Sequence, residues 1–329
     1  MVHLLNVFGL SVSVKKNGKL LKILDNISFS IDEGEILGLA GESGCGKSMT
    51  ALSILNLLPK DIEITGGEIF YNEQNLVKLG EKDLLKIRGS EISHVFQDVR
   101  QALNPLMKAG AQIAEMLELG AGRNKKNLKK IEIKKQVLEL LVSLGFEKPE
   151  KIYNAFPHQL SGGMCQRIMT AIAVIKNPRL LIGDEPSSSL DEESQRQCLS
   201  LLKDLNHKNK MSLFIISHDL SIIRQFCSRF LIMYAGKIVE EGPSDLLFSP
   251  LHPYTQALVN AIPGKDKRGK VLENIPGKVP SIDDQLTGCP FAPRCPRAKA
   301  GCLEIFPPAL QIGNRKVFCF YPATGETDE

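Results

Sequence analysis

Short apolar runs rich in β-branched residues alternate along the chain with longer segments of helical periodicity. The runs lie at Ile36 to Ala40, Ile92 to Phe96, Leu180 to Ile182, Leu213 to Ile216 and Phe230 to Tyr234. Strands that are buried on both faces read as continuous apolar runs, and alternation with helices is typical of parallel sheets. The pattern therefore predicts an α/β architecture.

Two regions depart from this alternation. From Asn104 to about Pro157 the sequence has few β-branched runs and a helical texture, and after Pro250 a tail punctuated by Pro and Gly begins. We therefore expect three parts. Residues 1–97 and 161–248 form a core with an antiparallel β subdomain, residues 98–160 form an inserted helical subdomain, and residues 249–329 form a C-terminal extension.

Composition narrows the class of protein. The 329 residues are 43% hydrophobic and 24% charged, which favours a folded chain of about two domains over a disordered one. A net charge of +4, 6% aromatics and no Trp argue against nucleic acid as a partner. No run reaches the roughly 18 apolar residues of a membrane span, and the N-terminus leads into strand-like sequence, so we expect a cytoplasmic chain.

A phosphate-binding loop follows the first apolar run. The segment Gly41-Glu42-Ser43-Gly44-Cys45-Gly46-Lys47-Ser48 fits the pattern G-x-x-x-x-G-K-[ST] between a strand and the helix-like stretch Met49 to Leu58. In such a loop the amides face phosphate oxygens, the lysine reaches the β- and γ-phosphates, and the serine hydroxyl binds Mg²⁺. The nucleotide-binding residues expected here are Gly41, Ser43, Gly44, Cys45, Gly46, Lys47, Ser48 and Met49.

The second motif is a pair of adjacent carboxylates. Asp184 and Glu185 follow the apolar run Leu180 to Ile182 and Gly183. Asp184 is expected to hold Mg²⁺, and Glu185 to orient and polarise the attacking water, because phosphoryl transfer is catalysed mainly by positioning and charge compensation. Alone, such a pair is also common as a plain surface feature. The phosphate loop upstream makes the catalytic interpretation the stronger one.

Between these motifs lies Leu160-Ser161-Gly162-Gly163-Met164, a Ser-Gly-Gly turn that opens a helix and can bind an anion. With this segment the set resembles the ATP-binding cassette (ABC) ATPases, in which the signature of one subunit closes on the nucleotide held by its partner. The resemblance implies a P-loop NTPase core, a dimer, and ATP contacts from Ser161, Gly162 and Gly163.

Three further segments resemble family motifs. Gln97 resembles the Q-loop glutamine and would join Ser48 and Asp184 at Mg²⁺, Ser189-Leu190-Asp191 resembles the D-loop with Asp191 near nucleotide, and His218 resembles the switch histidine. Taken singly, Gln97 reads as a surface amide and His218 as a core histidine. Their order in the chain favours catalytic roles for Gln97, Glu185 and His218.

Two positions raise questions of their own. The family usually stacks an aromatic residue on adenine at an early strand, but the matching position carries Val14, so another residue is expected to contact the base. Cys45 precedes a helix N-terminus, which predicts a lowered thiol pKa.

Further resemblance is to the ATPase subunits of dipeptide, oligopeptide and nickel importers. It rests on Phe96-Gln97-Asp98 with Leu103-Asn104-Pro105, on His252-Pro253-Tyr254-Thr255, and on the terminal cysteines. It implies a second, related ATPase as heterodimer partner, two transmembrane permease subunits, an extracytoplasmic substrate-binding protein, and a peripheral place on the cytoplasmic face of the membrane. The signature version resembles the first (D-type) ATPase of such pairs. The alternative is a soluble ABC ATPase that acts on ribosomes or DNA, or a metal-cluster regulator, and the single cassette without long heptad repeats argues against it.

Four of the eight cysteines crowd the C-terminus as Cys289-x5-Cys295-x6-Cys302-x16-Cys319. In a cytosolic chain such clustering indicates metal binding more than disulfides. The absence of a C-x2-4-C knuckle favours a [4Fe-4S] cluster over Zn²⁺, and members of the importer family are reported to carry one. Zinc, free thiols and disulfides remain alternatives.

Overall fold

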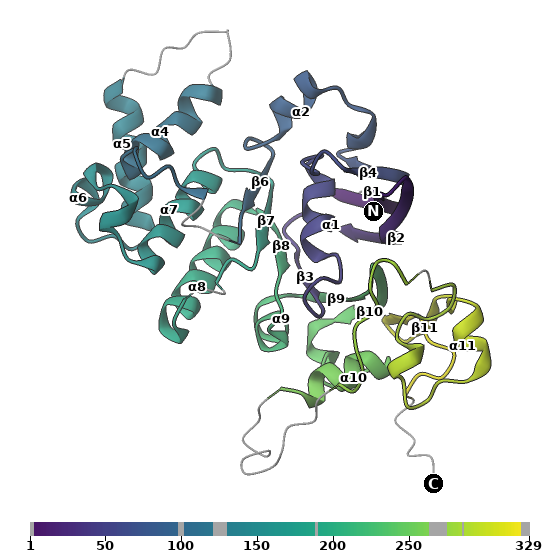
Figure 1. Cartoon of the computed structure of the whole chain (residues 1–329). Coiled ribbons are helices and arrows are strands. Elements are labelled where there is room, and N and C mark those ends of the chain that lie inside the picture. Colours follow the sequence, from purple (N-terminus) through teal and green to yellow (C-terminus); the bar gives the residue numbers. More distant parts are fainter. Residues whose placement is uncertain are drawn as a thin grey trace. The chain divides into compact units, whose positions relative to one another are not determined.

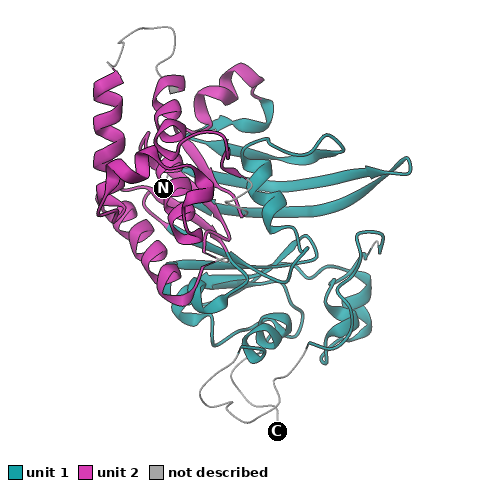
Figure 2. Cartoon of the chain, turned by 60° about the vertical axis from the view of Figure 1, so that its left-hand side comes forward, with its two compact units in different colours: residues 1–31, 36–78, 217–329 teal, residues 32–35, 79–216 magenta. Residues whose placement is uncertain are grey.

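The computed structural model describes residues 3–97, 102–120, 130–187, 190–262, 275–284 and 286–323. The chain divides into two compact units, which Figure 2 distinguishes by colour. Unit 1 contains residues 1–31, 36–78 and 217–329, and unit 2 contains residues 32–35 and 79–216.

An antiparallel sheet of four strands lies in unit 1, in the order β2-β1-β4-β5. Strands β1 and β2 are joined by Asn17 and Gly18, whose φ angles of 50° and 75° give the left-handed turn that suits a two-residue hairpin. Leu5, Val7, Leu10 and Val12 of β1 are fully buried, and the three-residue step from Val7 to Leu10 coincides with a shift of the pairing register at a bulge. The bounds are β1 (Leu5–Lys16), β2 (Lys19–Ile31), β4 (Ile62–Tyr71) and β5 (Gln74–Asn75).

Unit 1 also contains the strand that leads into the phosphate loop. In β3 (Ile36–Ala40) all five residues are buried, and β3 runs parallel to β9 (Arg229–Tyr234). Antiparallel pairing continues from β9 to β10 (Lys237–Pro243), then to β12 (Arg315–Val317) and β11 (Leu310–Ile312). Two short strands of the C-terminal extension therefore complete this sheet. The helices of unit 1 are α1 (Lys47–Ile54), α9 (Leu220–Phe226), α10 (Pro253–Asn260) and α11 (Ala300–Glu304), with 3-10 turns at Leu76–Lys78, Ser244–Leu246 and Ala292–Arg294.

In unit 2 three parallel strands lie in the order β8-β7-β6, with bounds β6 (Ile92–Val95), β7 (Leu180–Asp184) and β8 (Ser212–Ile216). A helical core packs Ile113, Val137, Leu141 and Ile168 together, all with no exposed surface. The elements of unit 2 are labelled in Figure 1. The helices among them are α2 (Glu81–Ile87), α4 (Ala109–Gly120), α5 (Lys130–Ser143), α6 (Pro149–Asn154), α7 (Gly162–Val174) and α8 (Glu192–Asn209), with a 3-10 turn at Pro157–Gln159.

The strands predicted from apolar runs are confirmed. The prediction for β3 matches its bounds, and the other four differ from β6, β7, β8 and β9 by at most two residues at either end. Helices α4, α5 and α6 confirm the helical texture predicted between Asn104 and Pro157. In the described part of the chain, no helix has the length and apolar character needed to cross a bilayer.

Candidate functional site

The phosphate loop lies in unit 1, between β3 and α1, as the motif predicts. Gly46 has φ 110°, a left-handed value, and a Cβ placed on it would come 2.6 Å from Leu24 Cδ2. Glycine is therefore required where the loop enters the helix. The loop is also anchored from outside, because the Gly236 N–H donates to the Cys45 carbonyl (2.8 Å).

Lys47 is held over the loop and is only 6% exposed. Its Nζ donates to the carbonyl oxygens of Gly41 (2.8 Å) and Glu42 (3.0 Å). The ammonium therefore lies where the loop's carbonyls converge, beside the first-turn amides of α1, which have no acceptor within the helix. A lysine and helix N-terminal amides together form a site for a phosphate chain.

The prediction of a lowered pKa for Cys45 is wrong. The thiol is 2% exposed, and its burial raises the pKa, which outweighs the attraction of the Lys47 ammonium 3.8 Å away. Cys45 is a buried thiol of the loop.

A cavity of about 530 Å³ opens beside Gly44 within unit 1. Ile23 and Asp25 of β2, Lys237 of β10, and residues of the segment 280–290 line it, whereas Val14 does not. Val14 is half-buried in β1, opposite Leu21. The structure therefore offers a space next to the loop that mixes apolar and polar side chains.

His218, the predicted switch histidine, belongs to unit 1. Its side chain is exposed, which excludes the alternative of a core histidine. The neighbouring Asp219 begins α9, where its carboxylate accepts from the Ser221 N–H (2.8 Å) and thereby fixes the segment.

Unit 2 carries the predicted catalytic carboxylates. Asp184 ends the buried strand β7 and is 6% exposed. Glu185 follows with φ 50°, an uncommon backbone conformation for a side-chain-bearing residue and one that is enriched at functional sites. Its N–H donates to the Ile216 carbonyl (3.0 Å), and its Oε2 accepts from Gln97 Nε2 (3.1 Å). The structure thus brings Gln97 and Glu185 together.

The signature segment and the D-loop aspartate each cap a helix of unit 2, and Ser194 connects them. Ser161 caps α7, where its Oγ accepts from the Met164 N–H (3.3 Å), and Gly162 and Gly163 form the first turn. Asp191 caps α8 by accepting from the Ser194 N–H (2.9 Å) and hydroxyl (2.8 Å), and these bonds lower its pKa. Ser161, Gly163 and Ser194 line one open pocket of about 1030 Å³. Ser189 and Asp98, named in the motifs above, lie outside the described residues.

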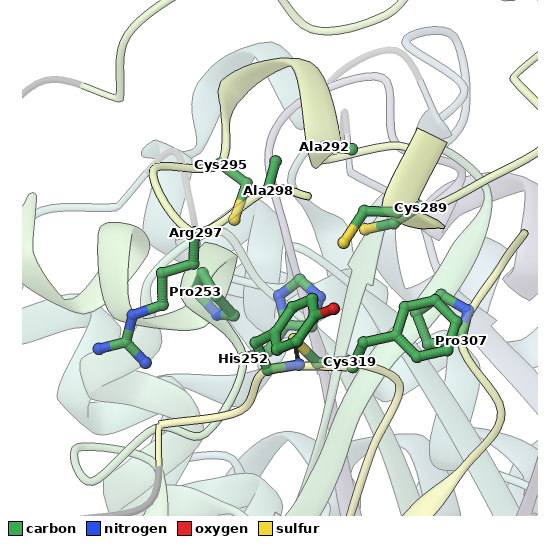
Figure 3. A pocket seen from close by; sticks show the side chains of 12 residues that line it. His252, Pro253, Cys289, Ala292, Cys295, Arg297, Ala298, Pro307 and Cys319 are labelled. Carbon is green, nitrogen blue, oxygen red and sulfur yellow. Dashed lines mark hydrogen bonds between the residues drawn. The ribbon is translucent and has the colours of Figure 1, made fainter. Parts of the chain in front are cut away.

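The four C-terminal cysteines line a single cavity, together with His252 (Figure 3). Burial raises the pKa of Cys289 and of Cys319 to about 11 and also raises that of Cys295. Among the described residues, no three His, Cys, Asp or Glu side chains converge as they would on one metal ion. The free space is about 20 Å³, which is room for roughly one water molecule.

His252 leaves a polar atom orphaned at this cavity. The side chain is 1% exposed, burial lowers its pKa to about 3, and its Nδ1 accepts from the Tyr254 N–H (3.0 Å). The proton of the neutral ring therefore lies on Nε2, which has no hydrogen-bond partner among the described residues. The adjoining cavity has room for an acceptor of this N–H, such as one water molecule. The sequence singled out His252 as part of an importer motif, but gave no signal that it would lie at the cavity of the cysteines.

Two family models match this chain, one in its N-terminal half and one near its C-terminus. Residues 24–188 match the family model described as ABC transporter, and residues 239–302 match the model described as oligopeptide/dipeptide transporter, C-terminal region. The oligopeptide transport ATP-binding protein AppD of Bacillus subtilis is 42% identical, over 97% of this chain and 97% of the relative. The dipeptide transport ATP-binding protein DppD of Haemophilus influenzae is 40% identical, over 97% and 96% respectively.

A solved structure agrees with the fold. The ATP-binding cassette MJ0796, in a dimeric post-hydrolysis state bound to ADP and Pi, aligns with a TM-score of 0.66 and 28% identity, over 73% of this chain and 98% of that one. The P-loop NTPase fold predicted from the motifs is confirmed. The chain therefore belongs to the ABC transporter family and is one of its ATPases.

Proposed function

We propose that this chain is the ATP-hydrolysing subunit of a membrane importer and energises the uptake of peptides. The observation that carries the proposal is similarity along nearly the whole chain, including the C-terminal region, to ATP-binding proteins named for peptide transport. Two permease subunits, a second related ATPase and an extracytoplasmic binding protein complete the machine. The chain then sits peripherally on the cytoplasmic face of the membrane.

Each predicted site residue takes a separate part in the chemistry. Lys47 and the loop amides bind the phosphate chain. The base and ribose enter the cavity beside Gly44, whose lining residues contact the base in place of the aromatic residue that is missing at Val14. Ser48, Asp184 and Gln97 hold Mg²⁺, which neutralises phosphate charge when bound. Glu185, held by Gln97, orients the attacking water, and His218 contacts the terminal phosphate. Ser161, Gly162, Gly163 and Asp191 face the nucleotide of the partner ATPase.

The cysteine cavity supports a bound [4Fe-4S] cluster as a second part of the proposal. A four-iron cube binds each thiolate at a different iron, so its ligands surround a space instead of converging on a point, and the His252 Nε2–H would donate to a sulfur there. The small free volume means that a cluster must move the thiols apart, whereas zinc must draw them together. Iron, sulfide and zinc measured on protein purified without oxygen distinguish the two: about four irons and four sulfides per chain support the cluster, and one zinc contradicts it.

The test of the importer role is copurification. The chain is tagged in its own host, membranes are solubilised in mild detergent, and the associated proteins are identified by mass spectrometry. Two permease chains and a second ATPase support the proposal, and the associated binding protein distinguishes a peptide cargo from nickel. A purely soluble preparation, or one that brings ribosomal or DNA-bound partners, contradicts it.

A further inference from the structure

A buried arginine joins the cysteine-bearing segment to the phosphate loop. Arg294 ends the 3-10 turn between Cys289 and Cys295, and its side chain is 4% exposed. Its Nη1 donates to Glu42 Oε2 (2.9 Å), and its Nη2 donates to Glu42 Oε1 (3.4 Å). Glu42 is the second residue of the phosphate loop, so this bidentate pair bridges parts of unit 1 that lie 252 residues apart in sequence.

The guanidinium is satisfied on its other sides as well. Nη1 also donates to the Tyr234 hydroxyl (3.1 Å), Nε donates to the Pro276 carbonyl (2.8 Å), and Nη2 donates to the Ile275 carbonyl (3.2 Å). Its carbon Cζ lies 5.9 Å from the ring centroids of both Tyr234 and Phe291. A planar donor fixed at this many points holds its carboxylate in one place.

Glu42 passes this constraint to the groups that would bind phosphate. Its N–H donates to the hydroxyl of Tyr254 (2.8 Å), and its carbonyl accepts from Lys47 Nζ (3.0 Å). The Tyr254 ring packs against Tyr234 and Phe291, with centroids at 4.5 Å and 5.3 Å. Glu42 is thus held at its carboxylate, its amide and its carbonyl, and the last of these contacts is to the predicted phosphate ligand.

We propose that Arg294 is a positioning residue for nucleotide binding, through which the C-terminal cysteine segment holds the phosphate loop in its binding conformation. The inference rests on the proposed function, because it assumes that the loop binds the nucleotide. It goes beyond that function by making nucleotide affinity depend on the C-terminal extension. Arg294 touches neither the reacting atoms nor the phosphates.

If the pair of Arg294 with Glu42 only stabilised the fold, the expected results would differ. Loss of such a pair would lower the midpoint of thermal unfolding and the active fraction, and therefore the apparent kcat, while the surviving folded molecules would bind nucleotide as before. Loss of a positioning residue weakens binding in folded molecules, so it raises Kd and KM and leaves kcat within about threefold. Affinity measured below the unfolding midpoint separates the two.

The experiment uses the full chain and ADP, with Kd measured by titration calorimetry below each variant's unfolding midpoint. Arg294→Met is expected to raise Kd about tenfold, since it removes the charged partner of Glu42. Arg294→Lys keeps the positive charge but loses the bidentate contact with Glu42, so its Kd should lie between those of the parent and of Arg294→Met. Combining Arg294→Met with Glu42→Gln should weaken binding no further than Arg294→Met alone, because both act through one contact.

Arg315 supplies matched controls in the same unit. Its Nη1 donates to the Ser249 carbonyl, away from the phosphate loop, so Arg315→Met and Arg315→Lys should leave the ADP Kd unchanged. Iron and zinc are measured on every sample to show that the cysteine cavity is equally loaded. Unchanged ADP affinity in both Arg294→Lys and Glu42→Gln would overturn the inference even if Arg294→Met fails to fold. An unsubstituted chain that binds no ADP would instead refute the proposed function.

Discussion

Replacing Glu185 by glutamine separates nucleotide binding from hydrolysis. The carboxylate accepts from Gln97 Nε2 at 3.1 Å, and the amide oxygen of glutamine can accept the same bond. Both residues carry the same cost of the backbone angle φ 50°. The substitution keeps this partly exposed hydrogen bond and removes a negative charge, so the free energy of unfolding should fall by less than about 1 kcal/mol.

Hydrolysis should respond far more strongly than stability. A positioned general base contributes about 10²- to 10⁴-fold, so Glu185→Gln should lower kcat by at least about 100-fold, which is about 3 kcal/mol in activation free energy. The loop and Lys47 are unchanged, so ATP should bind with the parent's Kd and hold the paired ATPases together.

The assay is phosphate release at saturating Mg-ATP by the complex purified through a tag on this chain, with ATP affinity measured on the same sample. Glu193→Gln is the matched control, because the Glu193 carboxylate also accepts from a glutamine amide, that of Gln197 at 3.5 Å, but lies on α8. The control should hydrolyse ATP at the parent's rate. Turnover by Glu185→Gln within threefold of the parent would refute the assigned role.

Three more predictions concern the loop and the cysteines. Lys47→Met should weaken ATP binding at least about 100-fold, because it removes the ammonium that would bind the phosphates. The control Lys316→Met, which breaks a surface ion pair with Glu241, should leave ATP binding unchanged. The Kd for ATP is measured by fluorescence titration. Gly46→Ala should destabilise the chain by about 1–3 kcal/mol in urea unfolding, because φ 110° disfavours a side chain, and Gly301→Ala, with nothing near its added Cβ, should be neutral or stabilising. In metal-free protein at pH 8, Cys289 and Cys319 should alkylate about tenfold more slowly than a thiol of pKa 9, since a pKa of about 11 leaves only about 0.1% thiolate and the higher nucleophilicity of that thiolate offsets part of the loss. The rate should rise about tenfold per pH unit up to pH 10, and a rate that levels off above pH 9 would show that the pKa is not raised.

The interactions that local pattern did not reveal are those between distant segments. The bond between Gln97 and Glu185 joins residues 88 positions apart, and the pair of Arg294 with Glu42 spans 252. Glu42 occupies a variable position of the loop motif, and Arg294 is one of many arginines in the chain, so neither stands out in sequence. Cys45 gives a second example: the motif placed its thiol at a helix N-terminus, but the pKa is raised because the folded chain buries the thiol almost completely.

The sequence by itself determined the strands of the parallel sheet, the phosphate loop and the carboxylates at the end of β7. These features follow from short-range chemistry, because a strand buried on both faces must be continuously apolar, and a phosphate loop needs particular residues at fixed spacing. Only the tertiary structure decided that strands β11 and β12 complete the sheet through Glu240 and Val317, that four cysteines and His252 share one cavity, and that Arg294 holds the phosphate loop. The physical reason is that such contacts are selected by the packing of the whole unit, where burial and hydrogen-bond satisfaction are shared among segments that no local pattern connects.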